Sequence, residues 1–205
     1  MLESIIAGII AAIVAGIILD WLHHWKKKKP SVIAGFIGKL FRKESNEKIL
    51  IYLSSGGTCR DPMAKAITLK ELENKEIDFR LRVEGMGLGP LSSNDVSFAA
   101  KYAIKALYNE DLLQTYKPEQ VNKELLDEAD LILVMDHSLM EHKLLQDILP
   151  RGKTYVFKDF FGLRGDIEDP YPDGKDQETL TKYLKCATEI RSIIKTGLDR
   201  LLGAL

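Results

Sequence analysis

The residues best suited to chemistry lie at positions 54–64, which read SSGGTCRDPMA and directly follow an apolar run, KILIYL, at 48–53. A strand that leads through small residues into a helix places several backbone N–H groups around one point. Converging N–H groups at the positive end of a helix bind anions, above all phosphate. The Arg side chain in this stretch can add a two-pronged contact to phosphate oxygens. We therefore predict a phosphate cradle made of Ser54, Ser55, Gly56, Gly57, Thr58, Cys59 and Arg60.

Two side chains of this stretch bear on covalent chemistry. Ser54 occupies the position where a phosphate-handling enzyme would carry its nucleophile, and Asp61 follows the Arg. A serine nucleophile needs an adjacent base, and Asp61 is the only candidate close in sequence, although its charge would also repel a phosphate dianion. Asp is a favoured helix N-cap and Pro a favoured first helical residue. We therefore expect the helix to start at Asp61–Pro62, with Asp61 beside the cleft.

The segments that must position this loop alternate between strand-like and helix-like patterns. Strands are expected at 48–53, 78–85, 130–135 and 153–157, and helices at 62–74, 95–108, 117–129, 137–149 and 177–202. This order predicts an α/β fold with a four-stranded, mainly parallel sheet flanked by helices. The uniformly apolar runs at 48–53 and 130–135 indicate buried strands, and the alternating 78–85 a strand nearer an edge. Ligands bind such sheets at the carboxyl ends of the strands, where the cradle lies.

The N-terminus has a different character. Residues 5–19 read IIAGIIAAIVAGIIL, the apolar stretch ends near Trp21 and Trp25, and four lysines follow at 26–29. Eighteen helical residues span roughly 27 Å, close to the ~30 Å of a hydrocarbon core. Because the basic block follows the apolar stretch, a retained signal-anchor with the later residues in the cytoplasm is favoured over a cleaved signal peptide. A buried apolar hairpin or core helix is the alternative.

The residues after this anchor predict a juxtamembrane segment. In SVIAGFIGKLFRK, at 31–43, apolar residues recur at helical spacing with Lys39, Arg42 and Lys43 between them. This pattern suits an amphipathic helix on an anionic leaflet, or a helix packed on the folded domain. The predicted organisation is a single-pass anchor at 1–25, a basic juxtamembrane segment and linker at 26–46, and a globular domain at 47–205.

Composition narrows the possible classes of function. The formal net charge is −1 over 205 residues, which argues against nucleic-acid binding through bulk charge. Cys59 and Cys186 form neither a disulfide framework nor a metal-ligand set, as expected in a reducing compartment. The four histidines are dispersed. We expect no metal site and no cofactor.

Three motifs together resemble the low-molecular-weight protein tyrosine phosphatase family, over roughly residues 48–202. The loop of that family runs C-x-x-N-x-C-R-S-P-M-A after a strand, where this chain has SSGGTCRDPMA. ELLDEADLILVM at 124–135 is similar to the third strand of the family and its preceding helix, and DIEDPYPDG at 166–174 to its Asp-Pro-aromatic loop. The resemblance implies the low-molecular-weight phosphatase fold.

The resemblance also implies roles for individual residues. In the family the first loop Cys attacks phosphorus, the loop Arg clamps the phosphoryl oxygens, and the Asp of Asp-Pro protonates the leaving group. By position, Ser54 replaces the nucleophile, Arg60 is the clamp and Asp169 the general acid, while Tyr171 lines the cleft. This chain also departs from the family pattern at Gly57, which replaces Asn, and at Asp61, which replaces Ser.

These departures lead to an expectation of impaired catalysis. A thiol is ionised far more readily than an alcohol in the same electrostatic field, so Ser54 lacks the main advantage of the family nucleophile. We expect a membrane-anchored, phosphatase-like protein that binds phosphate or a phosphorylated protein partner. An active phosphatase for phosphotyrosine or phosphoarginine is the alternative, since Thr58 also occurs in protein arginine phosphatases, and a membrane scaffold without a ligand is the second alternative.

Overall fold

The computed structural model describes residues 47–89 and 95–205. Four strands form one sheet in the order β2-β1-β3-β4, and all three pairings are parallel. The strands are β1 (Glu47–Ser54), β2 (Arg80–Gly87), β3 (Leu131–Val134) and β4 (Thr154–Val156). The predicted four-stranded parallel sheet is thereby confirmed, with β1 and β3 in its centre and β2 at an edge.

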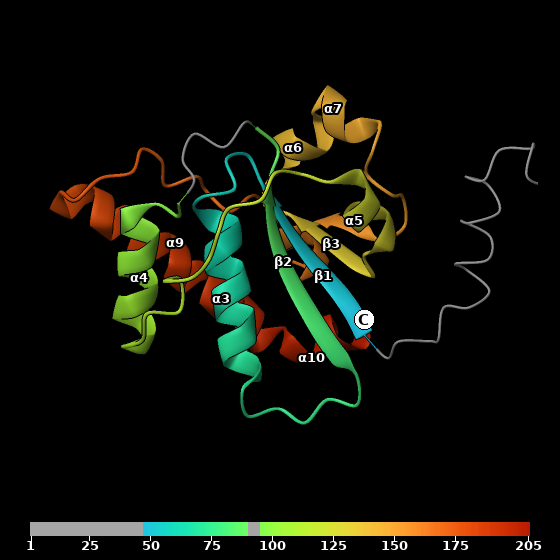
Figure 1. Ribbon diagram of the computed structural model, residues 1–205, viewed down its shortest axis with the longest axis horizontal. Coiled ribbons are helices and arrows are strands. Elements are labelled where there is room, and N and C mark those ends of the chain that lie inside the picture. The colour runs from blue at the N-terminus through green and yellow to red at the C-terminus, as the bar shows by residue number, and fades with distance from the viewer. Residues whose placement is uncertain (1–46, 90–94) are drawn as a thin grey trace, which may run out of the picture. The chain divides into compact units, whose positions relative to one another are not determined.

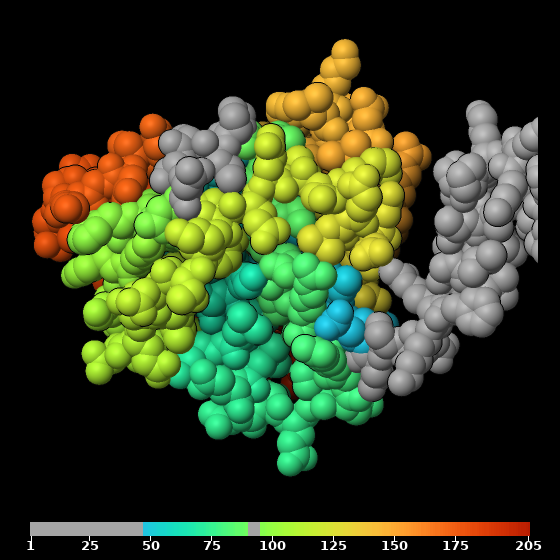
Figure 2. Space-filling view, in the orientation of Figure 1, coloured from blue at the N-terminus to red at the C-terminus, as the bar shows by residue number. Residues whose placement is uncertain are grey.

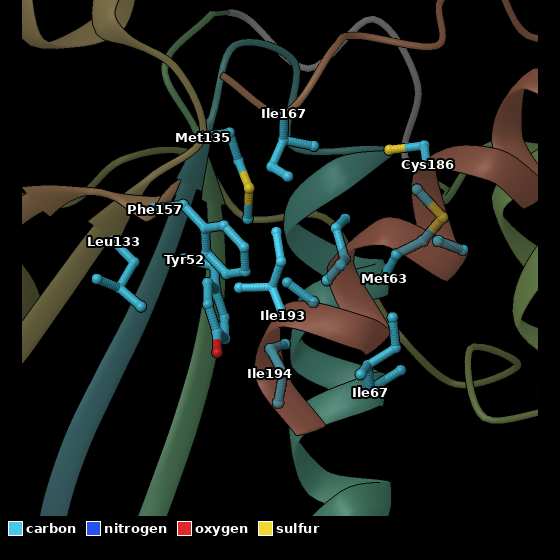
Figure 3. Packing of buried hydrophobic residues seen from close by; sticks show 14 of the residues in the cluster. Tyr52, Met63, Ile67, Leu133, Met135, Phe157, Ile167, Cys186, Ile193 and Ile194 are labelled. Carbon is cyan, nitrogen blue, oxygen red and sulfur yellow. The ribbon is translucent and has the colours of Figure 1, made fainter. Parts of the chain in front are cut away.

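Helices cover both faces of the sheet (Figure 1). They are α3 (Arg60–Leu72), α4 (Phe98–Tyr108), α5 (Lys123–Glu128), α6 (His137–Glu141), α7 (Lys143–Gln146), α8 (Phe157–Phe160), α9 (Gln177–Thr196) and α10 (Leu198–Gly203). The larger hydrophobic core lies between the sheet and helices α3, α4 and α9, and the smaller core lies on the opposite face under α5, α6 and α7. Figure 3 shows side chains of the larger core, among them Tyr52, Met63, Leu133, Phe157 and Ile193.

Alternation along β1 assigns its side chains to the two cores. Leu50 and Tyr52 belong to the larger core and Ile51 and Leu53 to the smaller one, as the two-residue period of a strand requires. The same period turns the side chain of Ser54 toward α3. The Tyr52 hydroxyl lies 2.7 Å from that of Thr68 on α3. Tyr52, two residues before Ser54, therefore already forms a polar contact between β1 and α3.

The start of α3 differs from the prediction. The helix begins at Arg60, Cys59 occupies the N-cap position, and no side chain caps the helix there. Asp61 therefore lies inside the first turn. Because Asp61 and Thr68 are seven residues apart, they share one helix face, and this face is turned toward β1.

Other helices are shorter than predicted. Residues 117–122 are not helical, since Gly87 pairs with Gln120 and draws this segment alongside β2. The segment 137–149 forms two short helices, α6 and α7, and the segment 95–108 becomes helical only after the N-cap Ser97. The closing segment 177–202 divides at Gly197, where a Cβ atom would lie 2.3 Å from the Phe161 ring. The short helix α8 was not predicted.

The predicted anchor and juxtamembrane segment, residues 1–46, lie outside the described residues. Within 47–89 and 95–205, no helix has the length and apolar character needed to cross a membrane. The described residues from 47 onward belong to one compact unit.

Candidate active site

A cleft of about 480 Å³ opens at the carboxyl end of β1. Its walls come from the loop between β1 and α3 and from the 166–174 loop. The lining residues are Ser54, Ser55, Gly56, Thr58, Cys59, Arg60, Asp169 and Tyr171. The structure thus brings together two motifs that are more than a hundred residues apart in the sequence.

Three carbonyl groups of the cradle loop accept hydrogen bonds from neighbouring backbone segments. Those of Ser54 and Ser55 accept from the backbone N–H groups of Leu88 and Gly89 at 3.0 and 2.9 Å, and that of Thr58 accepts from a residue at the start of α4 at 3.0 Å. In a trans peptide the N–H points opposite to the preceding carbonyl. The N–H groups that follow, those of Ser55, Gly56 and Cys59, therefore point away from these partners, and all three residues line the cleft, as an anion site requires.

Gly57 supports the cradle from behind and is not among the lining residues. Its φ of 69° lies in the left-handed region, which glycine adopts at little cost. The loop packs so closely on β2 that a Cβ atom at Gly87 would lie 2.6 Å from the Gly57 nitrogen. Glycine is therefore needed on both sides of this contact.

Ser54 and Asp61 form a direct hydrogen bond. The Ser54 hydroxyl donates to Asp61 Oδ1 at 2.6 Å and accepts from the Gly57 N–H at 3.2 Å. Ser54 is 2% exposed and Asp61 0%. The prediction that Asp61 caps the helix and lies in the cleft is therefore wrong: its side chain is buried behind Ser54, on the side of the hydroxyl away from the ligand space.

The segment between α4 and α5 covers Asp61. In Figures 1 and 2 this segment crosses in front of β2 and the upper end of α3. Its Tyr116 hydroxyl lies 3.1 Å from the Gly85 carbonyl, to which it donates, and 3.4 Å from Asp61 Oδ2. Burial raises the pKa of Asp61 to about 7, even though the Ser54 hydrogen bond and the Arg60 charge favour the carboxylate. Asp61 is thus a carboxyl group that titrates near neutrality.

Arg60 lies at the floor of the cleft, 3% exposed, and is held from two sides. One terminal nitrogen, Nη1, donates to Asp136 at 2.7 Å and to the Ile167 carbonyl at 2.9 Å. The other, Nη2, donates to Ser55 Oγ at 3.0 Å and to Asp169 at 2.8 Å. These four acceptors match the four N–H groups that the two terminal nitrogens carry. A phosphate that binds the Arg60 fork must therefore displace some of them.

The charge around the cleft has a direct consequence for ligand binding. Asp136 and Asp169 both pair with Arg60, so two carboxylates more than balance its single positive charge. Because Arg60 and the Ser138 hydroxyl favour the charged form, the pKa of Asp136 is lowered despite partial burial. Asp169 is the more exposed partner and also accepts from Ser55 at 3.1 Å. It is therefore the contact that an incoming anion can displace most readily.

The 166–174 loop is fixed at both ends. The Ile167 carbonyl holds Arg60, and Asp173 accepts from the N–H groups of Phe98 and Ala99 at 2.9 Å each. This places a carboxylate at the start of α4, where the helix dipole favours it. Between these anchors the Tyr171 side chain is 74% exposed at the rim of the cleft.

The two cysteines are free and buried, and neither occupies the nucleophile position. Burial raises the pKa of the Cys59 thiol, although hydrogen bonds with Thr58, Tyr183 and Ser97 oppose the shift. Burial also raises the pKa of Cys186, to about 12. Figure 3 shows Cys186 in the core near Ile167. Neither thiol is suited to attack phosphorus, because the thiolate is the reactive form.

Sequence reasoning missed three residues of the site. Asp136 follows the predicted strand 130–135 directly, so its position at the carboxyl edge of the sheet was a usable signal. Tyr116 and the Ile167 carbonyl carried no such signal, since each acts through a contact between distant segments. Among the described residues, no group of three or more His, Cys, Asp and Glu side chains could hold a metal ion.

The chain belongs to the low molecular weight phosphotyrosine protein phosphatase family, whose model matches residues 49–205. A protein-arginine-phosphatase of Bacillus subtilis is 28% identical over 123 residues, which are 60% of this chain and 79% of that protein. The family match explains why the cradle loop, the central strand pair and the Asp-Pro loop occur together.

Solved structures show the same fold. A low-molecular-weight protein tyrosine phosphatase from T. tengcongensis is 29% identical, with a TM-score of 0.58, and the match covers 77% of this chain and 99% of that one. An arginine phosphatase variant with a cysteine-to-serine change and a phosphorylated active-site serine has a TM-score of 0.61 at 23% identity, over 76% and 93% of the two chains.

Proposed function

We propose that this chain is a membrane-anchored phosphatase-like protein that binds phosphorylated proteins at the cleft above Arg60 and releases phosphate from them only slowly. The observation that carries this proposal is the cleft itself, with inward-facing N–H groups around a buried arginine fork. Such an arrangement recognises a phosphate monoester.

Two features support slow turnover. The nucleophile position holds Ser54, an alcohol that is ionised far less readily than a thiol, and Arg60 is engaged by two carboxylates before any ligand arrives. Both features raise the cost of the reaction, but neither removes the cradle. Binding is therefore the more strongly supported part of the proposal.

An active protein phosphatase is the second candidate. The Ser54–Asp61 hydrogen bond favours it, because a carboxylate in contact with a serine hydroxyl can act as its base. The similar arginine phosphatase variant that carries a phosphorylated serine also indicates that a serine in this fold can hold a phosphoryl group. The family includes phosphatases for tyrosine and for arginine, so either phosphorylated side chain is a candidate substrate.

Calorimetric titration with inorganic phosphate and with vanadate tests binding. We expect saturable binding by the full chain and a loss of at least tenfold in affinity for Arg60→Lys, which keeps the charge but not the fork. Equal affinity in both proteins would contradict binding at Arg60, and no binding in either would leave only the scaffold role.

The membrane anchor is a proposal that the apolar stretch at 5–19 and the lysines at 26–29 support. In cell fractions, the full chain should stay with membranes in high salt and be released by detergent. Release by salt alone would contradict a spanning helix.

A further inference from the structure

We infer that Asp61 is the general base for Ser54, and that Ser54 thereby takes the phosphoryl group from a bound phosphate monoester and holds it as phosphoserine. This inference rests on the proposed function, because it needs a phosphate monoester in the cradle. It gives Asp61, which departs from the family loop, a role in the chemistry.

The geometry around the Ser54 hydroxyl leaves one direction free for attack. A hydroxyl has one hydrogen and two lone pairs. The hydrogen is donated to Asp61, and one lone pair accepts from the Gly57 N–H. Ser54 is among the residues that line the cleft, so the second lone pair is available to a phosphorus atom seated above the loop.

Asp61 is positioned to receive the proton that Ser54 loses. The Ser54–Asp61 contact of 2.6 Å is within the range that general-base catalysis requires. Asp61 is covered by Tyr116 and by β2 at Gly85. The groups that face this carboxyl are the hydroxyls of Ser54 and Tyr116 and, on its own helix, the Arg60 charge.

The ionisation of Asp61 fits this role. With a pKa near 7, a base is present in part at neutral pH and is strong enough to accept a proton in the transition state. The neutral fraction also reduces the repulsion between Asp61 and a phosphate dianion. Burial therefore lowers the average negative charge of Asp61 behind the cradle, and the ionised fraction is the one that acts as the base.

In the proposed step, the phosphoryl group moves from the leaving oxygen to Ser54. The bond between Ser54 Oγ and phosphorus forms, the bond between phosphorus and the leaving oxygen breaks, and the Ser54 proton moves to Asp61. A leaving group as acidic as p-nitrophenol departs as its anion. With a less acidic leaving group, Asp169 at the cleft rim passes a proton from solvent to the departing oxygen.

The second step is expected to be slow. When water attacks the phosphoserine, the departing group is an alkoxide, which is far more basic than the thiolate that leaves a phosphocysteine. The proton on Asp61 must return to Ser54 during this step. Phosphoserine should therefore accumulate, which agrees with a protein that binds phosphorylated partners and turns them over slowly.

The test incubates the purified full chain, in detergent, with p-nitrophenyl phosphate. We expect a burst of close to one equivalent of p-nitrophenolate, a mass increase of one phosphoryl group, and fragmentation spectra that assign it to Ser54. Ser54→Ala should show neither burst nor mass increase. Phosphorylation of any other residue, or turnover without a burst in the wild type, would overturn the inference.

Asp61→Asn isolates the base, since the amide can still accept from Ser54 but cannot take up its proton. The burst rate should fall by about 100-fold or more, and its rise with pH through about 7 should disappear. Asp127→Asn, an equivalent change on the exposed face of α5, should match the wild type. A wild-type burst rate and pH profile in Asp61→Asn would overturn the role of Asp61.

Inorganic phosphate binding separates this inference from the proposed function. Binding without any phosphorylation of Ser54 refutes the inference and leaves the proposed function standing. A protein that neither binds inorganic phosphate nor becomes phosphorylated at Ser54 refutes both the inference and the proposed function. Phosphate binding that persists in Asp61→Asn while the burst is lost shows that the variant retains a folded cradle.

Discussion

The Ser54 hydroxyl and the Asp61 carboxyl are hydrogen-bonded at 2.6 Å, and both side chains are almost fully excluded from water. A buried carboxyl group is costly when it is charged, and one hydrogen-bonded hydroxyl offsets only part of that cost. The contact therefore links the chemistry proposed for Ser54 to the stability of the fold. This link can be measured separately from any enzymatic assay.

The first prediction concerns stability and pH. Burial raises the pKa of Asp61 to about 7, against about 3.9 in an unfolded chain. The folded state thus retains a proton that the unfolded state releases, and the stability that Asp61 contributes is present below about pH 4 and is lost by about pH 7. Asp61→Asn should gain stability relative to the wild type over this range, by on the order of 4 kcal/mol.

Urea unfolding at several pH values measures this difference. The exposed Asp127→Asn variant is the control and should follow the wild type throughout. A stability difference between Asp61→Asn and the wild type that stays constant from pH 4 to 8 would show that Asp61 is not a buried titrating group.

The second prediction concerns restoration of the thiol. Ser54→Cys alone should give only weak turnover of p-nitrophenyl phosphate, because the neighbouring Asp61 charge opposes ionisation of the new thiol. Adding Asp61→Ser removes that charge, and turnover should rise at least tenfold over the single variant. The two changes touch each other, so their effects should not be additive. A single variant as active as the double variant would argue against electrostatic coupling between the positions.

The third prediction concerns the resting ion pair between Arg60 and Asp169, 2.8 Å apart. An anion must displace Asp169 from Arg60, so Asp169→Asn should bind inorganic phosphate about tenfold more tightly. Two like charges 5 Å apart near a protein surface repel by about 3 kcal/mol, and the partial exposure of Asp169 reduces this. Calorimetry provides the affinity, and a weaker affinity in Asp169→Asn would mean that Asp169 helps to hold the ligand.

The fourth prediction concerns the support of the cradle. A Cβ atom at Gly87 would lie 2.6 Å from the Gly57 nitrogen and 2.7 Å from the Gly56 carbonyl carbon. Gly87→Ala should therefore push the loop out of place, lower phosphate affinity at least tenfold, and cost about 1–3 kcal/mol of stability. Gly203→Ala, where a Cβ atom meets nothing within 4 Å, is the matched control. Unchanged affinity in Gly87→Ala would mean that β2 does not fix the loop.

Local sequence was sufficient to predict the cradle and the parallel sheet. The apolar runs at 48–53 and 130–135 predicted the two central strands. The loop after the first run predicted that Arg60 lies at the carboxyl edge of the sheet. These features depend on short stretches of chain and on general rules for parallel sheets. The 166–174 loop, the other wall of the cleft, was expected from the resemblance to the phosphatase family.

The environment of Asp61 could not be predicted in the same way. An Asp before Pro at the start of a helix has the composition of an N-cap, and this local signal gave the wrong position. What decides its position is the two-residue period of β1 together with Tyr116, which is 55 residues away. Likewise, residues 117–122 have a helical pattern but lie beside β2 through the Gly87–Gln120 bridge. Tertiary contacts outweigh local propensity in both places.

The most direct test of the phosphate-binding site is a crystal structure of the protein with tungstate or vanadate. We expect the oxyanion within hydrogen-bonding distance of Arg60 and of the loop N–H groups at residues 55, 56 and 59, with Asp169 moved away from Arg60. An empty cleft at saturating oxyanion, with Asp169 still paired to Arg60, would contradict it.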